Sequence, residues 1–152
     1  HSHKEMANQN GEVIQSELGS INNIINSYLP DYAVETLALP KGSNPKSEYV
    51  PYMMEGEYEG KKYKNIAVLG VGWRPAYSPF DTMNDFTNLY RVTASETKVD
   101  SCGMYDYFKQ FENNKREKFI SDGNPNVVTI PKKYEKYINM NIVGDKLLNI
   151  FE

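Results

Sequence analysis

The amino-acid sequence predicts an α/β fold with a largely parallel sheet. Two observations lead to this class. Segments typical of strands and of helices interleave along the chain, and residues 66–71 form an unbroken apolar run. A run without polar alternation is typical of a strand that is covered on both faces, as the strands of parallel sheets are. The chain has 152 residues, which is enough for one domain with a sizeable core.

The first predicted helix spans about residues 10–28. Its apolar residues recur at steps of three and four, which places them on one face, and Pro30 ends the helix. Residues 34–39 are expected to form a short strand, which is followed at its carboxyl end by the breaker-rich segment 40–45.

The rest of the chain continues this alternation. Residues 47–54 are expected to form a short helix interrupted by Pro51, and the charged segment 57–64 is expected to be an exposed turn. The further predicted elements are strands at 66–71, 89–94, 127–130 and 146–151, a helix over 104–111 that begins at Ser101 or Gly103, a turn at 122–126, and one or two helical turns at 134–138.

The segment that follows the central strand is a candidate binding region. Residues 72–79 contain the only tryptophan, Trp73, together with Arg74 and Tyr77. Ligands of parallel α/β sheets bind at the carboxyl ends of the strands, and aromatic and Arg side chains there suit the stacking of a sugar or the binding of an anion. The alternative is that Trp73 fixes the loop onto the core, and the spacing alone does not separate these two interpretations.

Composition excludes some classes of function and leaves the compartment open. The net charge of -3 and a pI near 5.5 argue against a nucleic-acid partner. Cys102 is the single cysteine, so no internal disulfide can form. The sequence has no signal peptide, and no apolar run approaches the length of a transmembrane helix. The chain begins at His1 without a methionine, which is typical of a fragment, a processed product or a tagged protein.

The residues do not form a self-sufficient catalytic set. His1 and His3 are the only histidines, and a His-rich start is also typical of a tag. The sequence contains no nucleophile elbow, no glycine-rich phosphate loop and no cysteine spacing of the kind that binds metals.

A series of short motifs nevertheless follows one order along nearly the whole chain. The motifs are His3-Lys4, Thr36-Leu37-Ala38-Leu39-Pro40-Lys41-Gly42, residues 70–79, Tyr90-Arg91-Val92, residues 121–126 and residues 129–133. This succession resembles polysaccharide deacetylases of the NodB-homology class, and most closely a secreted or lipid-anchored subgroup from Gram-positive bacteria. The resemblance implies that residues 1–152 are the C-terminal portion of a single domain with a distorted NodB-like (β/α) barrel.

The resemblance also implies an activity. Family members are hydrolases that remove N-acetyl groups from sugars, here the sugars of cell-envelope glycans, with a divalent metal for which zinc is favoured. One Asp and two His residues hold that metal. His3 matches the second His and is the expected ligand, whereas the first His and the paired Asp residues would precede residue 1. Because such a centre needs at least three protein ligands, the chain alone is expected to be inactive.

The substrate-binding residues that the resemblance implies are Pro40, Lys41, Gly42, Trp73, Arg74, Tyr77 and Arg91. The family motif Arg-x-Pro-Tyr-Gly has lost its Arg and Tyr here, but the backbone N–H of Lys41 is still a suitable oxyanion donor. Arg74 or Arg91 is the expected substitute for the missing Arg. The late catalytic His of the family has no counterpart, because no histidine follows His3.

Three functions stay open at this point: part of an N-deacetylase, a non-catalytic glycan-binding module, or a structural subdomain that completes a split barrel. The resemblance implies an extracellular or cell-surface location, with any lipid anchor in a segment outside these residues. A barrel removes exposed sheet edges only by closing. The expected partners are therefore a glycan and either the N-terminal half of the same domain or a second copy of the chain. The alternative is a rearranged, self-sufficient small sheet that the helix at residues 10–28 covers.

Overall fold

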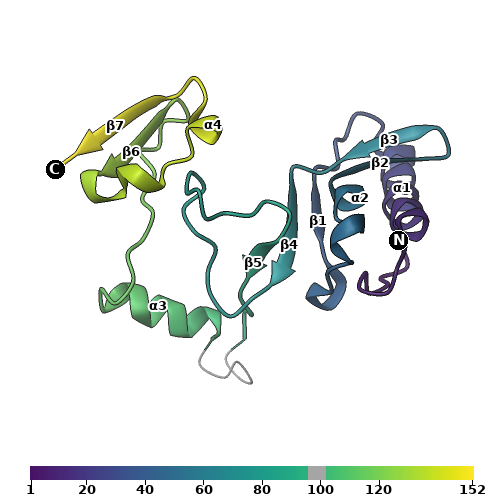
Figure 1. Ribbon diagram of the computed structural model, residues 1–152, viewed down its shortest axis with the longest axis horizontal. Helices are drawn as coiled ribbons and strands as arrows, with labels where there is room; N and C mark the ends of the chain where they lie inside the picture. The colour runs from purple at the N-terminus through teal and green to yellow at the C-terminus, as the bar shows by residue number, and fades with distance from the viewer. Residues whose placement is uncertain (96–101) are drawn as a thin grey trace. The chain divides into compact units, whose positions relative to one another are not determined.

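The computed structural model describes residues 1–95 and 102–152 (Figure 1). It has a mixed α/β structure with three small sheets, of which β1–β4–β5 and β6–β7 are parallel and β2–β3 is antiparallel. The predicted α/β class is therefore confirmed, and the strands of the described residues close no barrel. The chain divides into two compact units, His1–Arg74 with Asp85–Thr93, and Pro75–Asn84 with Ala94–Glu152.

The first unit begins with the predicted helix, α1 (Gly11–Tyr28). The side-chain oxygen of Asn10 accepts a hydrogen bond from the backbone N–H of Val13 at 3.0 Å, which satisfies one of the free N–H groups of the first turn. Ile14 and Leu18 are buried on the inner face of the helix. Their burial stabilises the helix, because apolar area removed from water contributes about 25 cal/mol per Å².

The parallel sheet of this unit is centred on β4 (Ala67–Val71), with β1 (Thr36–Ala38) on one side and β5 (Leu89–Arg91) on the other. Val68 in the central strand is fully buried, as the apolar run predicts. The core of the unit is a cluster of buried residues, namely Met6, Ile14, Leu18, Leu39, Met53, Tyr63 and Val68. Between β1 and β4 the chain forms η1 (Pro40–Gly42), η2 (Ser47–Tyr49) and α2 (Pro51–Met54), which confirms a short helical segment interrupted at Pro51.

The prediction of an exposed turn at residues 57–64 is wrong. These residues form most of an antiparallel hairpin, which consists of β2 (Glu55–Tyr58) and β3 (Lys61–Lys64). Its turn contains Gly60 with a φ of +74°, a conformation that glycine adopts without strain. The hairpin packs against α1, as Figure 1 shows.

The error follows from the two different faces of the hairpin. The outer face carries opposite charges in register, such as Glu57 opposite Lys62, and a charged run of this kind is also typical of a solvated connector. The inner face carries Tyr63, which is buried and donates a hydrogen bond to the backbone carbonyl of Tyr52 at 2.6 Å. Burial raises the pKa of Tyr63 to about 12. The hairpin is therefore part of the core and not only a connection.

One charged side chain lies inside the first unit. Glu17 on α1 is 6% exposed, and its carboxylate oxygens accept hydrogen bonds from the backbone N–H and the hydroxyl of Ser2, both at 2.6 Å. The Nζ atom of Lys4 lies 3.6 Å from the same carboxylate. Burial alone would raise the pKa of Glu17, but the hydrogen bonds from Ser2 and the ammonium group of the first residue outweigh burial and lower it.

Replacing Glu17 with Gln is expected to lower the free energy of unfolding by about 1–3 kcal/mol at neutral pH, because the Ser2 donors lose a charged acceptor. The folded-state pKa is lowered. The stabilisation is therefore present above the unfolded-state pKa and is lost as the pH falls through the folded-state pKa. Urea unfolding at neutral and acidic pH should show that the difference in the free energy of unfolding between the wild type and Glu17→Gln becomes smaller in acid. Glu12→Gln is the control, because Glu12 is exposed on the same helix. An equal loss of stability in both variants would contradict the role of Glu17 as the acceptor for Ser2.

The second unit contains the predicted elements of the C-terminal half. These are α3 (Met104–Glu112), β6 (Val127–Pro131), η3 (Lys132–Tyr137), the unpredicted short helix α4 (Met140–Val143), and β7 (Leu147–Phe151). Gly103 precedes α3, and its N–H donates to the Asp106 carboxylate at 3.0 Å, whereas Ser101, the other predicted start, lies outside the described residues. The register of β6 and β7 is parallel, so η3 and α4 form the crossover between them.

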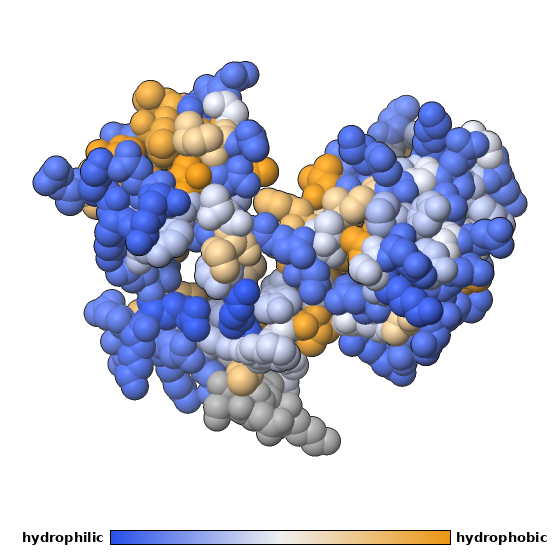
Figure 2. Space-filling view, viewed as in Figure 1, coloured by the Kyte–Doolittle hydropathy of each residue, from blue (hydrophilic) through white to orange (hydrophobic). Residues whose placement is uncertain are grey.

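Hydrophobic residues gather on the surface over β6, β7 and α4, as a comparison of Figure 2 with Figure 1 shows. Exposed large apolar side chains of α4 and β7 include Met140, Ile142, Leu147 and Phe151. Val128 and Val143 are buried in the same unit. In the part of the chain that the structure describes, no helix is both long and apolar enough to cross a membrane.

Candidate functional site

The parallel sheet of the first unit brings three segments to one edge. β1, β4 and β5 run in the same direction, and the register pairs Ala38 with Leu69 and Val71 with Arg91. The segments that follow these strands are η1 after β1, residues 72–74 after β4, and Val92 after β5. The carboxyl edge of a parallel sheet is where ligands of α/β proteins bind. We refer to this edge as the carboxyl edge.

The η1 turn forms one side of the carboxyl edge. Pro40 is buried, and Lys41 and Gly42 have positive φ values of 52° and 69°. A Cβ atom at Gly42 would lie 2.7 Å from the Cβ of Val71 and 3.0 Å from its backbone nitrogen. Glycine is thus required here by the backbone conformation and by the close approach of β4. The hydrogen bonds of the turn use the N–H groups of Gly42 and Ser43 rather than that of Lys41.

The segment before α1 lies along this turn. The Nζ atom of Lys41 is 2.5 Å from a carboxylate oxygen of Glu5, and the N–H of Ala7 donates to the Ser43 hydroxyl at 3.0 Å. The hydrogen bond to Glu5 and its negative charge raise the pKa of Lys41. His3 is exposed, with a φ of 62°. Within residues 1–95 and 102–152, no group of three or more His, Cys, Asp or Glu side chains is placed to hold a metal ion.

Arg91 joins the strands at the carboxyl edge. Its Nε donates to the carbonyl of Gly70 at 2.9 Å, and its Nη2 donates to the carbonyl of Leu39 at 3.0 Å. One guanidinium group on β5 is therefore bonded to the ends of both β4 and β1. The rigid planar arrangement of its donors suits two acceptors at once. The structure thus gives Arg91 a positioning role for the segments that carry Pro40 and Gly72.

Trp73 and Arg74 both lie beside Tyr90. The ring centroids of Trp73 and Tyr90 are 6.2 Å apart with an angle of 49° between the planes, and the guanidinium carbon of Arg74 lies 4.8 Å from the centre of the Tyr90 ring. Gly72 allows this packing, because a Cβ there would lie 2.4 Å from a ring atom of Tyr90. Trp73 is 70% exposed. It is therefore not a core residue, although its ring rests on a neighbour.

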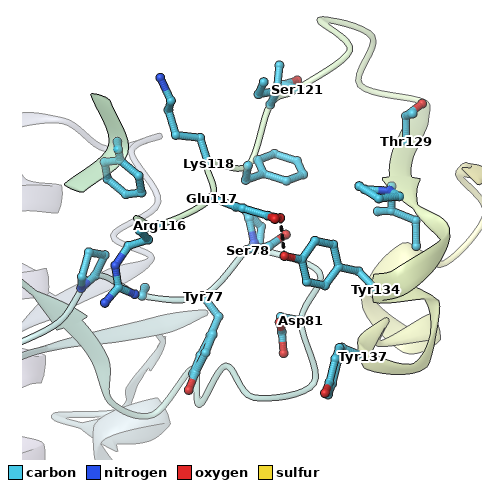
Figure 3. A pocket seen from close by; sticks show the side chains of 18 of the residues that line it. Tyr77, Ser78, Asp81, Arg116, Glu117, Lys118, Ser121, Thr129, Tyr134 and Tyr137 are labelled. Carbon is cyan, nitrogen blue, oxygen red and sulfur yellow. Dashed lines mark hydrogen bonds between the residues drawn. The ribbon is translucent and has the colours of Figure 1, made fainter. Parts of the chain in front are cut away.

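Tyr77 lies in the second unit and lines a pocket there of about 920 Å³ (Figure 3). Residues 75–81, 116–122 and 129–138 contribute most of its wall. Asn84 holds the first of these segments: its side-chain oxygen accepts the N–H of Tyr77 at 3.2 Å, and its amide donates to the carbonyl of Ser78. The N–H of Asn139 donates to the carbonyl of Phe80 at 2.8 Å, which ties the loop to the segment after η3.

Glu117 is the polar centre of this pocket. Its carboxylate accepts hydrogen bonds from the Tyr134 hydroxyl and from the Lys133 ammonium group, and the bond to Tyr134 is drawn in Figure 3. These bonds lower the pKa of Glu117 and raise those of Lys133 and Tyr134. Glu117 therefore stays ionised at neutral pH. Tyr134 and Lys133 keep their protons, so the cluster is suited to binding rather than to proton transfer.

The predicted substrate-binding residues thus fall into two groups. Those at the carboxyl edge of the first unit are Pro40, Lys41, Gly42, Trp73, Arg74 and Arg91, whereas Tyr77 lines the pocket of the second unit. Sequence reasoning missed Tyr90, and it missed Glu117 with Tyr134. Glu117 lies in a charged run and contacts residues 16 and 17 positions away, so no local spacing pointed to it.

Comparison of the chain with models of protein families, with curated proteins and with solved structures finds no match. A function for this chain therefore rests on its own geometry and on the motifs of its sequence. Two places in the structure carry chemistry suited to ligand binding. They are the carboxyl edge with its exposed Trp73 and the pocket around Glu117.

Proposed function

We propose that residues 1–152 bind N-acetylated glycans of the cell envelope at the carboxyl edge, as the C-terminal portion of a NodB-like polysaccharide N-deacetylase domain. The observation that carries the proposal is the position of Trp73. It is a largely exposed tryptophan at the ligand-binding end of a parallel sheet, next to Tyr90 and Arg74. Aromatic faces of this kind bind the apolar face of a sugar ring, and a neighbouring Arg donates hydrogen bonds to its hydroxyl or acetyl oxygens.

The other features of the carboxyl edge support the same proposal. Pro40 and Gly42 form a rigid turn that packs on Val71, and Arg91 holds this turn and β4 together through their carbonyls. A binding surface supported in this way needs little reordering when a ligand arrives, which favours affinity. The ammonium group of Lys41 is paired with Glu5 at this turn. The backbone N–H of Lys41 keeps its proposed role as an oxyanion donor in the complete domain.

The residues of this chain do not by themselves fit the metal centre of a deacetylase. His3 is exposed, and the described residues offer no group of three ligands that includes it. The proposal for the chain is therefore limited to glycan binding, and no catalytic step is assigned to it. His3 as a metal ligand belongs to the wider proposal, in which the N-terminal half of the domain supplies the other ligands.

The wider proposal also includes an extracellular or cell-surface location and a companion for the sheet. β1 and β5 are edge strands among the described strands, and the apolar side chains of Ile66 and Val71 are more than half exposed. Exposed strand edges and apolar flanks favour pairing with another chain segment. The N-terminal half of the same domain is the companion that the resemblance favours, and a second copy of the chain is the alternative.

Trp73→Ala is expected to weaken the binding of an N-acetylglucosamine tetramer at least about tenfold, which corresponds to about 1.4 kcal/mol. The reason is the loss of the aromatic face on which a sugar ring stacks. Titration calorimetry with the 152-residue chain measures the affinity. Trp73→Phe keeps an aromatic face and should retain most of the affinity for the tetramer. In the wild type the tetramer should also change the fluorescence of Trp73, the only tryptophan.

Tyr28→Ala is the matched control, because Tyr28 is another exposed aromatic residue of the first unit, at the end of α1 and 82% exposed. It should bind the tetramer as the wild type does. Equal affinities for the wild type and Trp73→Ala would contradict the proposed function. The absence of any binding to the wild type would contradict it as well.

A further inference from the structure

The pocket of the second unit combines flat aromatic faces with ionised carboxylates. Aromatic side chains contribute to every part of its wall, among them Tyr77, Phe108, Phe119, Tyr134 and Tyr137. The volume of about 920 Å³ is large enough for more than one sugar ring. Figure 3 shows the Tyr134 hydroxyl directed to the Glu117 carboxylate. Asp81 and Tyr137 line the same pocket.

The charge of the pocket lining favours a cation. Among the described residues that line it, four have carboxylates, Asp81, Glu112, Glu117 and Asp122, whereas two have cationic side chains, Arg116 and Lys118. Both cations keep their charge, so the lining has an excess of two carboxylates. The guanidinium of Arg116 lies 5.3 Å from the centre of the Tyr107 ring and its Nε donates to Gln110, and Figure 3 shows Lys118 extending away from Glu117 and Tyr134.

The neighbours of Glu117 leave part of this negative charge in place. Lys133 compensates Glu117 from the side of η3. The other two carboxylates that make contacts, Asp81 and Asp122, accept hydrogen bonds from the neutral backbone N–H groups of Met83 and Thr129. Their charges are therefore not cancelled. A protonated amine in the pocket would be attracted by the remaining negative charge of the lining and by electron-rich aromatic faces.

We propose that this pocket binds sugars that carry a free, protonated amine, and hence the deacetylated form of an amino-sugar glycan. The choice of a sugar rests on the proposed function, in which the complete domain removes acetyl groups and exposes such amines. The aromatic faces would stack on the sugar rings, and the carboxylates would pair with the ammonium groups. An N-acetylated ring lacks the charge and would bind less tightly. The second unit would then hold the product, separately from the carboxyl edge of the first.

The test compares two tetrasaccharides of the same backbone, a glucosamine tetramer and an N-acetylglucosamine tetramer, by titration calorimetry with the full chain. The glucosamine tetramer is expected to bind to the pocket at least about tenfold more tightly, and added salt should weaken its binding most. Glu117→Gln should reduce this binding about five- to tenfold. Because Glu117 also holds Lys133 and Tyr134, Glu112→Gln serves as a second variant at an exposed lining position and should reduce binding in the same direction.

Glu135→Gln is the matched control, since Glu135 pairs with Lys132 on the same unit and does not line the pocket. It should leave binding of the glucosamine tetramer unchanged. Binding of the two tetramers that is equally tight and depends equally on Glu117 would overturn the inference. Wild-type affinity for the glucosamine tetramer in both Glu117→Gln and Glu112→Gln would overturn it as well. A third outcome separates the two proposals. If the acetylated tetramer binds through Trp73 and the glucosamine tetramer does not bind at all, the inference about the pocket is overturned and the proposed function stands.

Discussion

Replacing Ile14 with alanine is expected to lower the free energy of unfolding of the first unit by about 2–5 kcal/mol, which is the usual range for truncating a large core residue. Ile14 is fully buried on α1, in the cluster that also contains Met53, Tyr63 and Val68. Interiors are packed as densely as organic crystals, so the removed atoms leave a cavity that the surroundings fill only in part. Urea unfolding followed by far-UV circular dichroism measures the loss.

Ile24 provides the matched control for this variant. It is the same residue type on the same helix, but it is 42% exposed. Ile24→Ala makes the same change in helix propensity and removes much less buried area, so its cost should stay below about 1 kcal/mol. If the two variants lose similar amounts of stability, the inner face of α1 is not where the structure places it.

Elements with a strong local pattern could be predicted from the sequence. α1 repeats its apolar residues at helical spacing and ends before Pro30, and the apolar run 66–71 predicts the strand β4. The middle of this run is buried as expected, whereas Ile66 and Val71 at its ends are more than half exposed. The β2–β3 hairpin is not apparent from the sequence, because its outer face is charged and its short inner face is marked only by Tyr58, which packs against Gly19 of α1, and by the buried Tyr63. α4 has four residues, which is too short for a periodic pattern to show.

The candidate site could be predicted only in part, for a physical reason. Trp73 and Arg74 could be placed at the end of a strand from local sequence, but the ring of Tyr90 that lies beside each of them comes from the neighbouring strand. The bond from Arg91 to Leu39 joins residues 52 positions apart. The register of a sheet decides which of these side chains meet, and no spacing in the sequence records it. The Glu117 cluster depends in the same way on folding of the second unit.

Gly42→Ala is expected to lower the free energy of unfolding by about 2–5 kcal/mol. Two effects add. Gly42 has a φ of +69°, which costs an alanine about 1–2 kcal/mol. Its new Cβ would also lie 2.7 Å from the Cβ of Val71 and 3.0 Å from the Val71 backbone nitrogen. Backbone cannot rotate away as the end of a long side chain can, so η1 and β4 must separate, at a further cost of about 1–3 kcal/mol.

Gly60 separates these two effects. It has a similar φ of +74° in the β2–β3 turn, and a Cβ there would meet no atom within 4 Å. Gly60→Ala should therefore show the conformational cost alone, about 1–2 kcal/mol. The excess loss in Gly42→Ala then measures the contact between η1 and β4. Because that contact supports the carboxyl edge, the same variant should also bind the N-acetylglucosamine tetramer more weakly, whereas Gly60→Ala should not. Equal unfolding losses for the two variants would show that η1 does not pack closely on Val71 in solution.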